Sequence, residues 1–415
     1  MVEGMRSTSA RDAFSFGYFS LGMQRKVTRQ QGETKCFVTD NNKQNLLLYF
    51  RYDIPTHITY TAFMLKASSS RYHLLLLLLI FLSNHAHGME EKYNTGWVLN
   101  LDNDILAERD RDYTGGIALT LSGRRAQEYL VSLEGVRNWL DDLLGIDKLY
   151  AVQPHFQLHS VQYGAMLFTP GDITNQAPIF DDRPYGSLFY LSNTELTVVP
   201  SADKAYLSTL TFGFLGLDAA EYIQKAIHAV TDSDVANGWD NQISSGGEPT
   251  LMVTLSAQNN HIDTVNTATR HEFKTTYEAN VGFSTDVNAS MSWRWGRINT
   301  PWWSFNPQHS EYIQLGAPVV SGNRQADKGE LYLWAGTTVK YRFYSSLMQG
   351  QFRDSIVKFS SDEVENLLAQ FWLGGTWEFA DNFRGSFFYR ASTREFEGNN
   401  AHYLVWAGLI ISRSY

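Results

Sequence analysis

Hydrophobic and polar residues alternate along most of this chain, and the final stretch shows the pattern most clearly. Between Asn382 and Tyr415, two runs of residues put apolar and aromatic side chains on one face and mostly polar ones on the other. In the first run, for example, Phe387 and Tyr389 share one face, while Phe388 and Arg390 share the other. Strict alternation with an aromatic-rich face predicts strands that contact lipid on one side and a polar interior on the other. An open sheet edge would leave backbone amides unpaired in hydrocarbon, so the pattern predicts a closed barrel.

The same alternation recurs at hairpin intervals after residue 95. It predicts an all-β fold, a transmembrane antiparallel β-barrel of about twelve strands, since bacterial barrels have even strand numbers. A soluble β-sandwich is the alternative, although it would bury its apolar face and expose fewer aromatic residues. Strands are expected near 96–101, 114–122, 151–163, 186–199, 205–217, 249–258, 272–281, 288–295, 330–344, 366–379, 383–397 and 402–415.

Two segments interrupt the strands with helical spacing. Between Arg124 and Ile146, apolar residues such as Leu133 and Leu140 share one face while Arg137 and Asp141 oppose them. We expect this segment to be an amphipathic insertion on the barrel mouth or on the membrane surface. A second helix is expected over 219–231, and the proline-containing stretch 298–329 is expected to be a loop.

Met64 begins a pattern typical of a secretory signal peptide. Lys66 and Arg71 supply positive charge, Leu74–Leu82 is an apolar run, and small residues follow up to Gly88. We therefore expect 1–63 to be a non-native upstream extension without a domain, 64–88 to be a signal peptide, and 89–415 to be the exported barrel domain. The alternative is a real soluble extension followed by a buried apolar strand. Export of a barrel implies a location in the cell outer membrane.

Composition narrows the choice of partner and chemistry. Aromatic residues make up 14% of the chain, which suits the interfacial girdles of a barrel. The formal net charge of -9 argues against nucleic acid as a partner. A single cysteine, Cys36, excludes a disulfide framework and a cysteine-based zinc site.

Polar clusters stand at several strand ends. The first joins Asn103 and Asp104 to the run Asp110–Gly116, which includes Thr114. Oxygen-rich clusters of this kind suit a hard cation such as Ca²⁺, although the spacing is not that of an EF-hand. The alternative is ordinary turn chemistry, because Asp, Asn, Gly and Thr are common in turns.

Two further clusters follow along the chain. In the run Asp181–Ser187, Arg183 stands beside carboxylates and suits either an ion pair or a phosphate contact. On the second predicted helix, Gln224 and His228 lie one turn apart, and Asp234 follows soon after. A lone histidine on an amphipathic helix is more often a packed or surface residue, but a neutral imidazole is also a competent general base.

These motifs together resemble those of the outer-membrane lipid A 3'-O-deacylases. They occur in the same order over about Gly96 to Tyr415, and six in order are fairly specific. The matching motifs are Asn103-Asp104, Asp112-Tyr113-Thr114-Gly115-Gly116, Phe168-Thr169-Pro170, Asp182-Arg183-Pro184-Tyr185, Gln224 with His228, and Gly238-Trp239-Asp240-Asn241-Gln242.

The resemblance implies a twelve-stranded barrel with its site at the outward-facing end, which removes the 3'-O-linked acyloxyacyl group of lipid A in a calcium-dependent reaction. It implies that His228 activates water and that Asn103, Asp104 and Thr114 line the site, with Asp104 and Thr114 near the Ca²⁺. Asp234 falls where the family has Glu, one methylene longer, and it is expected to be a catalytic residue and a metal ligand.

The partners implied are lipid A within lipopolysaccharide and the lipids of the outer membrane, with the protein as a monomer. A catalytically inactive barrel that acts as a channel or a structural protein is the alternative. An outer-membrane phospholipase would need a Ser–His pair, and none stands in a convincing setting.

Overall fold

The structure, a computed structural model, divides into two units, Met1–His87 and Gly88–Tyr415. It describes residues 37–39, 45–54, 57–66, 95–104, 112–127, 132–149, 153–231, 234–266, 269–307, 329–380 and 382–415.

The first unit contains a three-stranded antiparallel sheet. Its strands are β1 (Phe37–Thr39), β2 (Asn45–Ile54) and β3 (His57–Lys66), in that order. No strands were predicted before Met64, so this sheet is a difference between the structure and the prediction. β2 and β3 are rich in Leu, Tyr, Phe and Ile, which favour strands even without clean alternation. Most of the predicted signal peptide, 67–88, lies outside the described residues, and that assignment stays a prediction.

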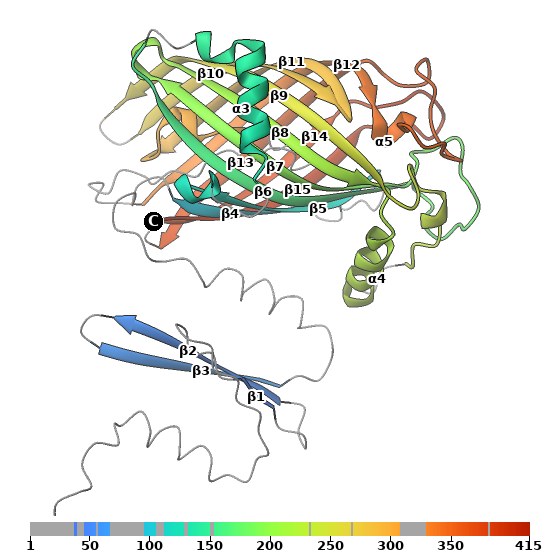
Figure 1. Ribbon diagram of the computed structural model, residues 1–415, viewed down its shortest axis with the longest axis horizontal. Helices are drawn as coiled ribbons and strands as arrows, with labels where there is room; N and C mark the ends of the chain where they lie inside the picture. Colours follow the sequence, from blue (N-terminus) through green and yellow to red (C-terminus); the bar gives the residue numbers. More distant parts are fainter. Residues whose placement is uncertain are drawn as a thin grey trace, which may run out of the picture. The chain divides into compact units, whose positions relative to one another are not determined.

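The second unit is a closed antiparallel barrel, as the alternation predicted (Figure 1). Each strand pairs with its neighbours in sequence, and the last strand closes the ring on the first through pairs such as Leu409 with Leu101. The strands are β4 (Gly96–Asn103), β5 (Asp112–Ser122), β6 (Phe156–Thr169), β7 (Gly186–Val199), β8 (Lys204–Leu215), β9 (Glu248–Val265), β10 (Arg270–Gly282), β11 (Ser284–Arg297), β12 (Leu331–Ser345), β13 (Leu367–Ala380), β14 (Phe383–Ser392) and β15 (Leu404–Ser414).

All twelve predicted strands are present, and the largest error in their predicted bounds is at β6. That strand was predicted at 151–163, whereas it runs from Phe156 to Thr169. Its bounds follow from continuous pairing with β7, from Phe156 with Val198 to Phe168 with Gly186. Alternation within one strand cannot reveal where its partner begins and ends.

Side chains alternate between the outer wall and the lumen as expected for a membrane barrel. On β12, for example, Leu331, Leu333 and Val339 are more than half exposed on the outer wall. Tyr332 and Trp334, which alternate with them, are buried inside.

The lumen is packed with side chains. One buried cluster joins aromatic residues from across the barrel, among them Tyr113, Trp334, Trp372 and Trp406. At one end, Trp302 of the η7 turn (Trp302–Ser304) joins a second buried cluster with Leu158 and Leu196. The hydrophobic core of this unit therefore lies inside the barrel.

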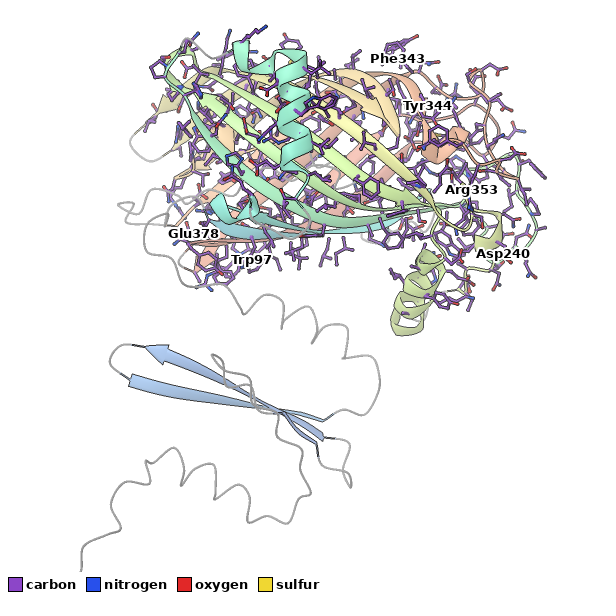
Figure 2. All side chains as sticks on the ribbon, viewed as in Figure 1. Trp97, Asp240, Phe343, Tyr344, Arg353 and Glu378 are labelled. Carbon is purple, nitrogen blue, oxygen red and sulfur yellow. The ribbon has the colours of Figure 1, made fainter. Side chains whose placement is uncertain are left out.

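The two ends of the barrel differ. At one end, the first barrel strand begins and the last one finishes, and the main-chain nitrogen of Tyr415 donates to the Thr95 carbonyl oxygen at 2.8 Å. This end is here called the termini end. The opposite end, here called the site end, carries α4 (Ala219–Thr231), η6 (Trp239–Asn241) and α5 (Ser346–Gln349). Figure 2 labels Trp97 and Glu378 at the termini end and Asp240 and Arg353 at the site end.

The remaining short helices follow β5 and β7. They are η3 (Arg124–Gln127), α3 (Glu134–Leu144), η4 (Ile146–Leu149) and η5 (Pro200–Ala202). The second predicted helix is confirmed with the same bounds as α4, and the first corresponds to η3, α3 and η4. Among the residues that the structure describes, no helix is long and apolar enough to cross a membrane.

Candidate functional site

The first polar cluster lies on the outer wall at the site end. Asn103 ends β4 two residues after Leu101, which is 36% exposed, so the alternation puts both on the outer wall. Thr169, at the end of β6, lies on the same outer face of that strand as Tyr163 and Leu167. Thr114 joins it there, since the two hydroxyl oxygens lie 2.8 Å apart. Asn103 Nδ2 donates to the Thr114 carbonyl oxygen.

A bulge in β5 creates this arrangement. The register between β5 and β6 shifts between Tyr113 and Gly115, so that Thr114 has no partner of its own in the ladder. Gly115 has φ +145°, and a Cβ there would meet the Asp102 carbonyl oxygen at 2.7 Å. Only glycine tolerates both the conformation and the close approach. The bulge therefore brings Thr114 toward Asn103 and Thr169.

Asp104, directly after Asn103, is 1% exposed. Its carboxylate, the Asn103 amide and the two threonine hydroxyls are all oxygen donors of the kind that Ca²⁺ prefers, and the contacts described above join the last three. Within the described ranges, no group of three or more His, Cys, Asp or Glu side chains is arranged to hold a metal ion. The side chains of Asp110 and Asp112, from the same predicted cluster, lie outside the described residues. The donor set fits a calcium site in kind, with one buried carboxylate.

His228 lies in the last turn of α4 and is 3% exposed. Its Nδ1 contacts the main-chain carbonyl oxygen of Asp234. A carbonyl oxygen only accepts hydrogen bonds, so the neutral imidazole carries its proton on Nδ1. Nε2 then has the free lone pair, which is the form of the ring that can take a proton from water.

Gln224, one turn before His228, is 1% exposed. Its Oε1 accepts a hydrogen bond of 2.6 Å from Trp239 Nε1. Among the described residues, its Nε2 has no hydrogen-bond partner. Trp239 therefore fixes the amide with its donor end free, beside the helix face that carries His228.

Buried contacts connect α4 with the first cluster. Ala220 of α4 and Trp239 of η6 belong to one buried cluster with Leu167 of β6. Leu167 pairs with Gly115 of β5, the residue after Thr114. The first turn of α4 is thus packed against the same part of the outer wall as Asn103 and Thr114, and His228 follows about two turns later on the helix.

Asp234 is joined to this site by its main chain. Its carbonyl oxygen holds the His228 ring, while the residue itself is exposed. The expected role of its carboxylate as a metal ligand stays a prediction. The observed contact does not depend on side-chain length, so Asp in place of Glu leaves the orientation of the histidine ring unchanged.

The run Asp181–Ser187 has a structural role. Arg183 pairs with Glu395, and Arg342 Nη1 lies 2.7 Å from the other oxygen of the same carboxylate. These two guanidinium groups hold the pKa of Glu395 at about 2 against the opposing effect of its burial. Asp182 Oδ2 accepts from the Gly171 main-chain nitrogen at 2.8 Å, and so fixes the loop. Arg183 therefore forms an ion pair, as one of the two alternatives predicted, but its partner is the distant Glu395 and not the adjacent carboxylates.

Two residues of the site, Thr169 and Trp239, were not predicted as site residues. Thr169 contacts Thr114, and Trp239 holds Gln224 and packs on Tyr185 with ring centroids 5.0 Å apart. Burial raises the pKa of Tyr185 to about 12, and its hydroxyl donates to the Ile173 carbonyl oxygen at 3.0 Å. Both missed residues belong to motifs that carried the family resemblance, which was the only signal for them.

The fold and the site define a class: an outer-membrane β-barrel with a packed lumen and a polar site on its outer wall at one end. The family model described as "Outer membrane protein LpxR" matches residues 74–415. The chain belongs to that family, and the resemblance inferred from the motifs is confirmed.

One solved structure supports the fold, and a second match has a lower score. LpxR from Salmonella typhimurium is similar with a TM-score of 0.59 at 13% identity, and the match covers 77% of this chain and 100% of that one. An outer membrane channel from Pseudomonas putida F1 has a TM-score of 0.36 at 9% identity, over 80% of this chain and 100% of that one. No curated protein sequence matches the chain.

Proposed function

We propose that this protein is a calcium-dependent lipid A 3'-O-deacylase, an ester hydrolase of the outer membrane that is exported by the signal peptide 64–88. The observation that carries the proposal is His228, a buried histidine with Nδ1 bound to a carbonyl oxygen, on a helix whose first turn contacts the outer wall. The family membership supports lipid A as the substrate. The site works in one chain, and we expect a monomer.

In the proposed reaction, His228 Nε2 takes a proton from a water molecule that attacks the carbonyl carbon of the 3' ester. The imidazolium then gives that proton to the sugar oxygen as the carbon–oxygen bond breaks, and the fatty acid leaves. The Asp234 carbonyl oxygen keeps the ring oriented in both protonation states, because Nδ1 donates to it throughout. The Gln224 amide, fixed by Trp239, offers a donor to the ester oxygen.

Calcium would be held by Asp104 and Thr114, with Asn103 beside them and Asp234 as the further predicted ligand. A bound cation supplies electrostatic stabilisation of negative charge on the ester oxygen. The fit rests on the oxygen donors of this cluster and on the buried Asp104 carboxylate.

The position on the outer wall suits a lipid substrate. An ester of lipid A lies at the boundary between headgroup and acyl chains, and a site on the wall near one barrel end meets that boundary from the side. The channel alternative has less support, because aromatic side chains and the η7 turn fill the described part of the lumen.

Mass spectrometry of lipid A tests the proposal. Cells that produce the protein should contain lipid A lacking the 3' acyloxyacyl group, and cells without it should not. Purified protein in lipopolysaccharide vesicles should release that group with Ca²⁺ and stop with EDTA. Intact lipid A at saturating Ca²⁺, from correctly assembled barrels, would contradict the assignment.

A further inference from the structure

Helix α3 is amphipathic in an inverted sense. Its large apolar side chains point away from the protein, with Val136 52%, Trp139 60% and Leu143 67% exposed. Arg137 and Asp141, in contrast, are buried against the barrel. A helix in water does the reverse, because it buries apolar groups and leaves charges solvated. The exposed face of α3 is therefore suited to an apolar medium.

The buried face is held by a polar network on the outer wall. Arg137 donates through Nε to Asn193 at 2.9 Å, through Nη2 to Glu195 at 2.9 Å and through Nη1 to Asp141 at 2.6 Å. Asn193 and Glu195 alternate with Leu196, which belongs to the lumen cluster, so both lie on the outer wall. Ser208 Oγ donates to the second oxygen of Asp141 at 2.6 Å.

These contacts show how the helix runs. Arg137 reaches Glu195 on β7, and Asp141, one turn later, reaches Ser208 on β8. Glu195 and Ser208 are paired directly across the two strands. One helical turn of about 5.4 Å thus spans one strand spacing of about 4.8 Å. The helix crosses the strands around the girth of the barrel, as Figure 1 shows, and would lie parallel to a membrane plane.

The depth of α3 follows from the same pair. Glu195 precedes Val199, the last residue of β7 at the termini end, by about four residues. At about 3.3 Å per residue and a tilt of about 40°, α3 lies about 10 Å inside the end of β7. A membrane boundary near the end of β7 would put α3 at the depth at which amphipathic helices rest in a bilayer interface.

We propose that α3 is a built-in interfacial helix whose partner is phospholipid: acyl chains of the leaflet at the termini end cover Val136, Trp139, Leu143 and Leu144. Three observations favour lipid over a protein partner. The exposed face continues the apolar outer wall, Val136, Trp139 and Leu143 form its centre while Asp142 is exposed at its edge, and the buried Arg137 is paired with Asp141 of the helix and Glu195 of the barrel. The proposal is independent of the catalytic assignment.

Spin labels on the full chain in phosphatidylcholine vesicles test this proposal. In a Cys36→Ser background, labels at Trp139→Cys and Leu143→Cys are compared with Val287→Cys, an outer-wall position of β11, and Asp354→Cys in a loop at the site end. Both α3 labels should be accessible to oxygen and shielded from a water-soluble nickel complex, as at Val287. Asp354 should show the opposite behaviour.

Two results would overturn the proposal. Nickel accessibility at 139 and 143 equal to that at Asp354 would put α3 in water. Low accessibility to both reagents would mean that protein, such as a second copy, covers the helix. As a check without labels, brominated phosphatidylcholine should quench less fluorescence in Trp139→Phe than in the wild type, and equal quenching would contradict lipid contact.

Discussion

Helix α3 packs along the outer wall of the barrel, whereas α4 contacts that wall through its first turn, and both helices bury polar side chains. On α3, all three guanidinium nitrogens of Arg137 donate hydrogen bonds to acceptors in the wall or in the helix. On α4, Gln224 is buried with one end of its amide held by Trp239 and the other end without a partner among the described residues. His228 follows one turn later.

The difference separates a structural site from a chemical one. Buried polar groups that satisfy one another stabilise a particular arrangement. A buried donor left free, beside an imidazole fixed in one tautomer, is prepared to bind something that the chain does not contain. The two helices therefore predict different outcomes for substitutions that look alike.

Arg137→Met should have the largest effect on stability. It leaves the Glu195 carboxylate buried without its cation, which costs about 3–5 kcal/mol of unfolding free energy. Urea unfolding in vesicles, followed by tryptophan fluorescence, measures this loss. The double variant Arg137→Met/Glu195→Met should recover only part of it, because Asp141 stays buried without its guanidinium partner. Lys148→Met, an exposed change beside the same helix, is the control, and an equal effect of both single variants would refute the network.

Asp104→Asn should change the calcium requirement. Loss of the buried charge should raise the half-saturating Ca²⁺ concentration about tenfold, equivalent to about 1.4 kcal/mol. Asp234→Asn should raise it less, because Asp234 is exposed. Calcium titration of lipid A deacylation compares the two variants. A larger shift for Asp234 would make its carboxylate the principal ligand.

Gln224→Ala should lower the rate of deacylation about tenfold at saturating calcium, since a hydrogen bond of about 1–1.5 kcal/mol is lost. Lys225→Ala, on the exposed side of the same helix, should keep full activity. Initial rates with both variants in the same vesicles provide the comparison. Equal rates would confine Gln224 to a packing role.

Acid should loosen the site end before the rest of the barrel. The folded pKa of Glu395, about 2, lies below its ordinary value of 4.5. The stabilisation is therefore complete above about pH 4.5 and is lost as the pH falls toward 2. Hydrogen exchange of 393–403, expressed relative to the intrinsic exchange rate at each pH, should rise as the pH falls across this range, and Glu395→Gln should remove that rise. A flat profile in the wild type would contradict the paired state.

The sequence predicted the barrel well because alternation is a local property of each strand. It also predicted α4 at 219–231. It did not show which way α3 faces, because an amphipathic pattern is the same with either face inward. The missing information was on β7, where Asn193 and Glu195 occupy outer-wall positions and therefore need a cover.

The residues of the candidate site were predicted from the motifs that resemble the family, and not from strand patterns or packing. Asn103, Thr114 and His228 are buried or bonded groups of the site end, and their predicted roles stay predictions. The bulge at Gly115 that joins the first two leaves no mark in the alternation. The role of Asp234 through its main chain was also beyond prediction, since a carbonyl oxygen is present at every residue. Contacts such as Trp239 with Gln224 depend on the tertiary fold.

The most direct test of the central claim compares two histidines of this chain. His228→Ala should abolish loss of the 3' acyl chains, with a fall in rate of at least about 100-fold, while the barrel still assembles. His261→Ala, an exposed change on β9, should leave deacylation unchanged. Lipid A mass spectra from cells producing each variant give the answer. Continued loss of the 3' acyl chains with the His228→Ala variant would contradict the account.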